Sequence, residues 1–293
     1  MNVLVTGGSG GIGLETALGI ARKTAANVWV TGRNEGRLED AVRALKAAGA
    51  SDARAFRADF SSLDDVRRLA NEVSAAAEGG LDVLVNNAGL WHQERQESAD
   101  GFEDTFAVNH LAPFLLTLLL TPRLMEAGSP GRAARVVNVS SRLHERPSAL
   151  RLEELVGQEP SYVGLSVYAR TKLCNVLFSN ELARRLEGRG VVSNALHPGS
   201  VQTDVTRDSF LLSIGIRIAA PFLKTAAEGA LTSIRLATDP ALEGVTGGYF
   251  SDEAQLPPSE AALDTGAAKE LWDRSLEWTG LDAGSLAGPL RAA

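Results

Sequence analysis

The sequence predicts an α/β fold in which a doubly wound parallel sheet carries helices on both faces. Short runs rich in Val, Leu and Ile alternate with helix-like stretches to about residue 200, a pattern typical of βαβ units. The runs are apolar almost without interruption, as expected for strands that are buried on both faces. The predicted strands cover 3–6, 28–31, 53–57, 83–86, 135–139 and 191–196.

We expect one domain over residues 1–282, because no Pro/Gly/Ser-rich linker divides the chain. Residues 283–293 are rich in Gly, Ala and Pro and are expected to form a flexible tail. Four segments interrupt the alternation of strands and helices: 127–134, 142–164, 205–224 and 252–268. The apolar segment 205–224 is interpreted as a lid over an apolar substrate; a packing helix, a partner surface and a membrane-surface contact are the alternatives.

Composition excludes several classes of function. The 293 residues are 44% hydrophobic and 22% charged, as in ordinary soluble proteins, and the net charge of -7 with no basic block argues against a nucleic-acid partner. One cysteine, Cys174, and four scattered histidines offer neither a disulfide nor metal-ligand spacing. The longest apolar run, 111–120, is too short to span a bilayer, and no signal peptide precedes the first strand, so we expect a cytoplasmic protein without a transmembrane segment.

A glycine-rich turn links the first predicted strand to a helix over 14–23. Glycines let the backbone approach a pyrophosphate, and the helix N-terminus supplies free N–H groups and a partial positive charge. A plain tight turn would have the same composition, so this motif indicates nucleotide binding only together with the motifs described below. The residues of the predicted cradle are Gly7, Ser9, Gly10, Gly11, Ile12 and Gly13.

The end of the second strand favours NADP over NAD. Gly32 stands where an acidic residue would bind the adenosine ribose hydroxyls, and Arg33 and Asn34 follow it. The planar, permanently charged guanidinium of Arg33 suits a ribose phosphate, although a solvated surface arginine is the plainer alternative.

Three further motifs carry polar groups, two directly after strands and one near the start of a helix. Asn87, Ala88 and Gly89 follow the fourth strand, and Ser140 and Ser141 follow the fifth. Tyr168 and Lys172 are i and i+4 on one helical face. A nearby cation favours the tyrosine anion, which would bring the Tyr168 pKa toward neutrality and suit it to general acid or base catalysis. Most such Tyr/Lys pairs lie on surface helices, so the pair indicates catalysis only in combination with the other motifs.

With TGGSGGIG, NNAG, the Asn of VNH, NVSS, YARTK and HPG in this order, the chain resembles the classical short-chain dehydrogenase/reductases, which have a Rossmann fold. YARTKLCNVLF, VNHLAPFLL and the later GGYF are similar to the retinol-dehydrogenase-like branch, as is the long separation between Ser141 and Tyr168. The first motif also satisfies the G-x-x-G-x-x-G spacing of sugar epimerases, but NNAG and the PG motif favour the classical family.

The resemblance implies a role for each matching residue. Tyr168 would exchange a proton with the substrate oxygen, Lys172 would lower the Tyr168 pKa and bind the nicotinamide ribose, Ser141 would polarise the carbonyl, and Asn109 would anchor a relay water. Ser140 is the rival of Ser141. The remaining residues expected to contact the cofactor are Asp59, Phe60, Asn87, Ala88, Gly89, Pro198, Gly199, Val201 and Thr203.

These observations predict an NADP(H)-dependent oxidoreductase that acts on a carbonyl or alcohol of an apolar small molecule. The alternatives are an NADP-binding redox sensor without turnover and an epimerase or dehydratase on the same fold. Relatives of this family often pair through the helices bearing Asn109 and Tyr168, but nothing in this sequence demands a homo-oligomer, and the oligomeric state stays open. The histidines and Cys174 are interpreted as packing residues, with His144 the one that could touch a substrate.

Overall fold

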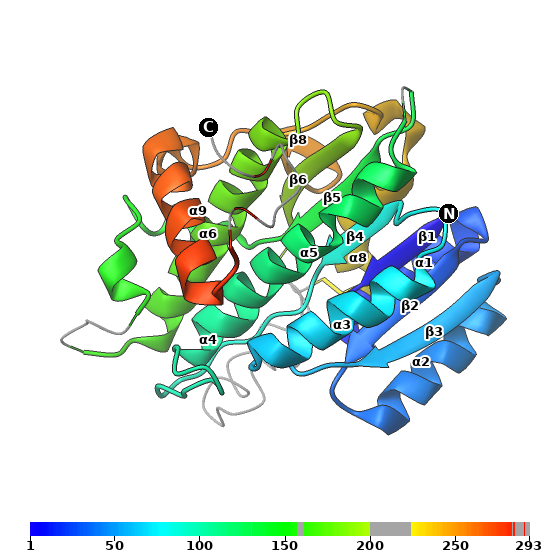
Figure 1. Ribbon diagram of the computed structural model, residues 1–293, viewed down its shortest axis with the longest axis horizontal. Coiled ribbons are helices and arrows are strands. Elements are labelled where there is room, and N and C mark those ends of the chain that lie inside the picture. Colours follow the sequence, from blue (N-terminus) through cyan, green and yellow to red (C-terminus); the bar gives the residue numbers. More distant parts are fainter. Residues whose placement is uncertain (130, 157–160, 200–223, 283, 285–289, 291–293) are drawn as a thin grey trace.

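The computed structural model describes residues 1–293 except 130, 157–160, 200–223, 283, 285–289 and 291–293. In the described part, a single eight-stranded sheet has the order β3-β2-β1-β4-β5-β6-β7-β8 (Figure 1). All six predicted strands are confirmed, with ends shifted by a residue at most. They are β1 (Asn2–Val5), β2 (Asn27–Gly32), β3 (Asp52–Arg57), β4 (Val83–Asn86), β5 (Ala134–Val139) and β6 (Val191–His197).

Two strands at the far edge are additional to those predicted. β7 (Tyr249–Ser251) pairs parallel with β6, and β8 (Ala254–Leu256) pairs antiparallel with β7. The parallel sheet therefore ends in one antiparallel strand, which lies inside the predicted loop 252–268. The next turn of that loop, η7 (Glu260–Leu263), leads into the last long helix.

Helices cover both faces of the sheet, so the predicted doubly wound α/β architecture is confirmed. One face carries α1 (Gly11–Thr24), α2 (Glu35–Ala47) and α8 (Ala226–Thr238). The other carries α3 (Leu63–Ala76), α5 (Ala112–Ala127), α6 (Gly164–Arg185) and α9 (Thr265–Thr279). The shorter helical elements are α4 (Asp104–Phe106), η1 (Ala107–Leu111), η2 (Arg142–Glu145), η3 (Leu152–Glu154) and η6 (Pro240–Leu242).

The first strand illustrates why its sequence is apolar at every position. Val3 and Val5 enter the core beneath α1 and α2, whereas Leu4 enters the core on the opposite face. Side chains alternate between the faces of a strand, so burial of both faces requires an uninterrupted apolar run.

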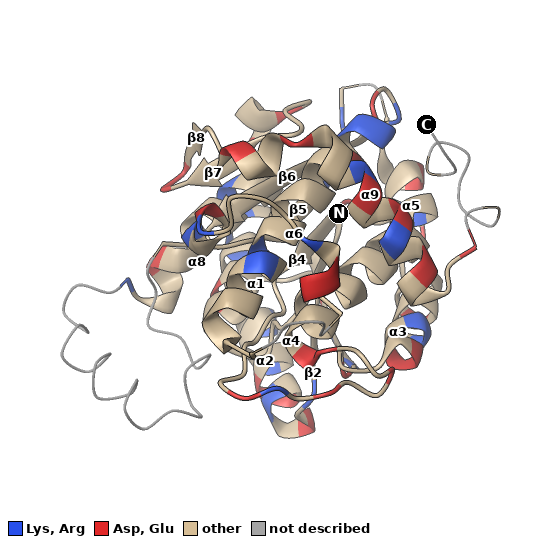
Figure 2. Ribbon diagram, turned by 90° about the vertical axis from the view of Figure 1, so that its left-hand side faces the viewer, with Lys and Arg blue, Asp and Glu red and all other residues tan. Residues whose placement is uncertain are grey.

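On the side of the protein seen in Figure 2, basic and acidic residues are interspersed along the helices.

The continuous helix Asp104–Ala127 is the one described segment that is long and apolar enough to cross a membrane by length and composition. Its most apolar window is 89% buried inside the protein, as is usual for a core helix. The absence of a transmembrane segment stays a prediction.

Most of the predicted lid (205–224) and most of the predicted tail (283–293) lie outside the described residues. Leu290, in that tail, is fully buried, and its carbonyl accepts a hydrogen bond from Arg185 Nη1 at 3.3 Å. This side chain joins the core beside α6, and the flexibility of the tail as a whole stays a prediction.

Candidate active site

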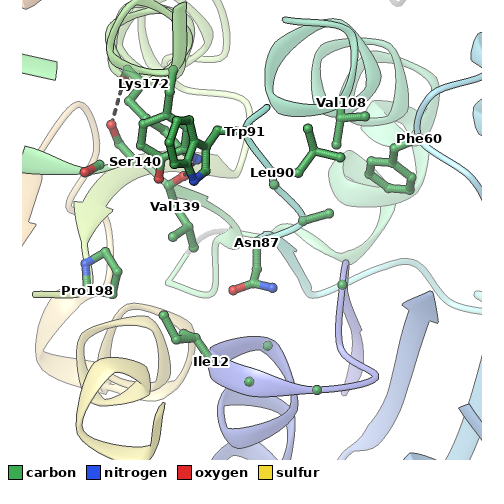
Figure 3. A pocket seen from close by; sticks show the side chains of 18 of the residues that line it. Ile12, Phe60, Asn87, Leu90, Trp91, Val108, Val139, Ser140, Lys172 and Pro198 are labelled. Carbon is green, nitrogen blue, oxygen red and sulfur yellow. Dashed lines mark hydrogen bonds between the residues drawn. The ribbon is translucent and has the colours of Figure 1, made fainter. Parts of the chain in front are cut away.

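A cavity of about 710 Å³ lies at the carboxyl ends of the parallel strands. It is centred where β1 has β2 on one side and β4 on the other, the point at which the chain reverses direction across the sheet and where such folds bind ligands. Figure 3 shows Ile12 and Asn87 near its middle, Phe60 and Val108 toward one end, and Ser140 with Lys172 toward the other. Ser141, Tyr168 and Lys172 thus line the same cavity as the predicted cradle.

The glycine turn after β1 has the geometry of an anion cradle. Gly7 and Gly11 have φ of 65° and 53°, which favour glycine. A Cβ on Gly13 would lie 2.4 Å from Asn87 Nδ2 and 2.4 Å from the Gly7 carbonyl oxygen, so a side chain has no room there. A Cβ on Gly10 would meet nothing within 4 Å, because this residue faces the open cavity.

The start of α1 leaves its backbone N–H groups available. No side chain caps this helix, and its first turn holds no acidic residue. In contrast, side chains cap α2, α3, α8 and α9, through Asn34, Ser62, Thr225 and Asp264. An uncapped N-terminus at a glycine-lined cavity fits the pyrophosphate of a dinucleotide.

The far end of the cavity is basic. Arg33 and Arg37 both line it, and within the described ranges neither is paired with a carboxylate. A Cβ on Gly32 would lie 2.6 Å from Ser9 Oγ, so an acidic side chain would displace that serine. Asn34 does not line the cavity; its Oδ1 accepts from Arg37 N at 2.9 Å and caps α2. Helix capping engages only its Oδ1, so a contact of Asn34 with the cofactor stays a prediction.

The other predicted cofactor residues lie along the cavity. Asp59, Phe60, Asn87, Ala88 and Gly89 line one side, and Pro198 and Gly199 line the other, whereas Val201 and Thr203 lie outside the described residues.

Thr6, which was not among the predicted site residues, holds the loop after β4 in place. Its Oγ1 accepts from Asn87 N and Ala88 N, both at 3.0 Å. Its position in the sequence, directly before the glycine turn, could have indicated that its side chain lies at the site.

Hydrogen bonds distinguish the two serines after β5. Ser140 Oγ donates to the Lys172 carbonyl at 2.7 Å and so ties β5 to α6 (Figure 3). Ser141 Oγ accepts from Leu143 N at 3.2 Å and forms a hydrogen bond with the Tyr168 hydroxyl. Ser140 is thus committed to the backbone, and Ser141 is the serine that meets Tyr168.

Burial controls the protonation of Tyr168 and Lys172. Lys172 Nζ lies 5.4 Å from the centre of the Tyr168 ring and donates to the Val139 carbonyl at 3.1 Å. Burial raises the pKa of Tyr168 to about 12, although its bond to Ser141 acts the other way, and burial lowers the pKa of Lys172 to about 8. Burial is the main cause of this shift in the Tyr168 pKa, and the expected lowering of that pKa by Lys172 stays a prediction.

Asn109 supports the site without lining the cavity. It lies in the π-helical turn η1, where its Nδ2 donates to the Leu90 carbonyl at 2.8 Å and to Thr171 Oγ1 at 3.0 Å. Its Oδ1 accepts from Leu90 N at 2.8 Å. The side chain thus fastens the loop after β4 to α6, and a water on Asn109 stays a prediction.

The remaining candidates behave as packing residues. Cys174 is fully buried, and burial raises its thiol pKa, so it is no nucleophile. His197 lines the cavity, and its Nδ1 accepts from Gly199 N at 3.0 Å. No cluster of metal-ligating side chains is found among the described residues.

The short-chain dehydrogenase family model matches residues 1–153. Mouse retinol dehydrogenase 12 is 39% identical over 280 residues, which cover 95% of this chain and 86% of that protein. The chain belongs to the short-chain dehydrogenase family. It falls in the retinol-dehydrogenase-like branch, and its family acts on CH–OH and C=O groups with a nicotinamide cofactor.

Two more proteins show how far the similarity extends. Mouse polyprenol dehydrogenase is 39% identical over 293 residues, which cover 97% of this chain and 85% of that protein. The structure of Pseudomonas aeruginosa RhlG in an active-site complex with NADP matches with a TM-score of 0.68 and 28% identity, over 85% of this chain and 93% of that one.

Proposed function

We propose that this protein uses NADP(H) to interconvert a carbonyl and an alcohol on an apolar small molecule, with Tyr168 as the general acid/base. The observation that carries this proposal is that one cavity holds the glycine cradle and the Ser141–Tyr168–Lys172 group. A sensor or a simple nucleotide-binding protein would need the cradle but not a buried tyrosine bonded to a serine.

The choice of NADP rests on Arg33 and Arg37. Both guanidinium groups lie at the end of the cavity where the adenosine ribose would lie, and no acidic residue stands at Gly32 to hold free ribose hydroxyls. The related RhlG structure, whose printed description includes NADP, supports the same choice.

In the reducing direction, NADPH held along the glycine cradle would supply the hydride for the carbonyl carbon. Tyr168 carries its proton at neutral pH, because its pKa lies near 12, and donates it to the carbonyl oxygen as negative charge develops there. The Ser141 hydroxyl, which lies beside that of Tyr168, would donate its own proton in a hydrogen bond to the same oxygen. The products are the alcohol and NADP⁺, and solvent returns a proton to Tyr168.

Apolar side chains beside Tyr168 favour an apolar substrate. Leu143 follows Ser141 by two residues, Leu165 lies in the first turn of α6, and Leu90 and Trp91 continue the wall. Related proteins are named for retinol and polyprenol, which are both apolar alcohols.

The deciding experiment measures oxidation of NADPH and, separately, NADH by the purified protein with aldehydes, ketones and quinones. We expect NADPH-dependent turnover that falls by about 10²- to 10⁴-fold in Tyr168→Phe, while NADPH binding persists. Equal use of NADH would contradict the choice of cofactor. Unchanged turnover in Tyr168→Phe would contradict the assignment of the acid/base, and tight NADPH binding without turnover of any compound would favour a sensor.

A further inference from the structure

We propose that His144 is a positioning residue, which holds the Ser141 hydroxyl in place for the reaction through a bond to the Ser141 main chain. This inference rests on the proposed function. His144 is fully buried in the 3₁₀ turn that follows Ser141, and it does not line the cavity. It therefore acts on the site without touching the substrate.

Hydrogen bonds specify one neutral form of the His144 ring. Nδ1 lies 2.8 Å from the Ser141 carbonyl oxygen, which can only accept, so Nδ1 carries the proton. Nε2 lies 3.2 Å from Ser259 N, which can only donate, so Nε2 must be the unprotonated acceptor. Burial lowers the pKa of His144 and favours this uncharged ring. Its ring centre also lies 4.7 Å from that of Tyr249.

The ring bridges two distant parts of the chain. Ser259 directly precedes η7, 115 residues from His144, whereas Ser141 follows β5 by two residues and lines the cavity. The Ser141 carbonyl accepts from the His144 ring and also from the His144 backbone N–H at 3.0 Å, and Ser141 Oγ accepts from Leu143 N within the same turn. The direction of the Ser141 hydroxyl toward Tyr168 depends on both anchors.

Two substitutions of His144 separate positioning from packing. His144→Phe keeps an aromatic ring against Tyr249 but loses both hydrogen bonds. His144→Asn can place its amide nitrogen near the former Nδ1 and donate to Ser141, but it leaves a cavity. We expect kcat to fall about 10- to 100-fold in His144→Phe, and to recover in His144→Asn although the latter is less stable. NADPH affinity and KM should stay within about twofold of wild type.

Ser259→Ala is the matched control, because it keeps the backbone N–H that donates to His144 Nε2 and removes only the long bond of 3.5 Å from Ser259 Oγ to the His144 carbonyl. Its kcat should equal that of wild type. A double-mutant cycle with Ser141→Ala gives a second test: His144→Phe should lower kcat little further once the serine hydroxyl is absent. The proposal would be overturned if the kcat losses of His144→Phe and Ser141→Ala multiplied in the double variant. It would also be overturned if kcat fell in proportion to stability across the His144 variants.

A turnover-independent measurement separates failure of this inference from failure of the proposed function. In ¹⁵N spectra of wild type at neutral pH, we expect the His144 ring to be protonated at Nδ1 and bare at Nε2. A ring protonated at Nε2 would overturn the bridge whether or not any carbonyl is reduced, whereas an inactive wild type with the expected ring would reject only the proposed reaction.

Discussion

Burial disfavours the charged forms of both Tyr168 and Lys172, and this has consequences for the pH dependence of the reaction. The pKa of Lys172 is lowered to about 8, so the ammonium is present below pH 8 and is lost above it, whereas Tyr168 stays protonated throughout. We expect kcat/KM for NADPH-dependent reduction to be level near pH 7 and to fall above about pH 8, because the cation beside Tyr168 disappears. A pH profile measures this. The residual activity of Lys172→Arg should lack the fall, and a wild-type profile level to pH 10 would contradict the argument.

Arg33 should determine the preference between the two nicotinamide cofactors. Loss of a hydrogen bond to a charged phosphate costs about 1.5–3 kcal/mol, so Arg33→Ala should weaken NADPH binding by roughly 10- to 100-fold and leave NADH binding nearly unchanged. Fluorescence titration with each cofactor measures both constants. Arg43→Ala is the control, because Arg43 is an exposed arginine on α2 that pairs with Asp40 and does not line the cavity. Equal weakening of NADPH and NADH would show that Arg33 does not contact the phosphate.

The turn between β1 and α1 offers a test at the level of the element. An alanine methyl at Gly13 would overlap Asn87 and the Gly7 carbonyl, whereas one at Gly10 enters open space from an extended backbone with φ of 180°. We expect Gly13→Ala to destabilise the protein by about 1–3 kcal/mol and to impair NADPH binding. Gly10→Ala should keep wild-type stability and lose only affinity for NADPH. Thermal unfolding and NADPH titration together measure this, and equal stability of the two variants would be the contrary result.

The helix α9 changes the expectation about oligomers. It lies along α6 (Figure 1), and its Trp272 packs against Phe114 of α5 and Phe178 of α6, under the guanidinium of Arg185. The helix α9 therefore covers part of α5 and α6, the helices through which relatives were expected to pair. We expect Trp272→Ala to lower the free energy of unfolding by about 3–5 kcal/mol, as for removal of any large core side chain. Denaturant unfolding measures this, and a loss below about 1 kcal/mol would show that α9 is only loosely attached.

The sequence predicts elements better than contacts. The six long parallel strands could be found because burial on both faces demands continuous apolar runs. β8 could not, because its three residues are all exposed and its pairing depends on the preceding turn. The motif residues found the cavity, but the choice between Ser140 and Ser141 could not be made from spacing, since it depends on which hydroxyl meets the Lys172 carbonyl. That Asn34 caps α2 could not be predicted either, because a helix cap and a ligand contact call for the same side chain.

For the molecule as a whole, buried histidines make stability depend on pH. His110, His144 and His197 are buried, and desolvation lowers the pKa of each, that of His110 to about 3. The unfolded chain therefore binds protons at a higher pH than the native protein does. The stability that these residues contribute is complete above about pH 6.5 and is lost as the pH falls through their native pKa values.

Between pH 6.5 and pH 5, where carboxylates change little, each such histidine should lower the free energy of unfolding by up to about 1.4 kcal/mol per pH unit. Denaturant unfolding at a series of pH values measures the slope. His110 is the cleanest case, because its Nε2 bonds to Ser275 Oγ and it lies away from the cavity, packed on Phe106. His110→Gln should be less stable than wild type at pH 7.5 but should show a shallower fall toward pH 5. Parallel curves for the two proteins would mean that protonation of His110 is not coupled to unfolding, and that the acid sensitivity arises elsewhere.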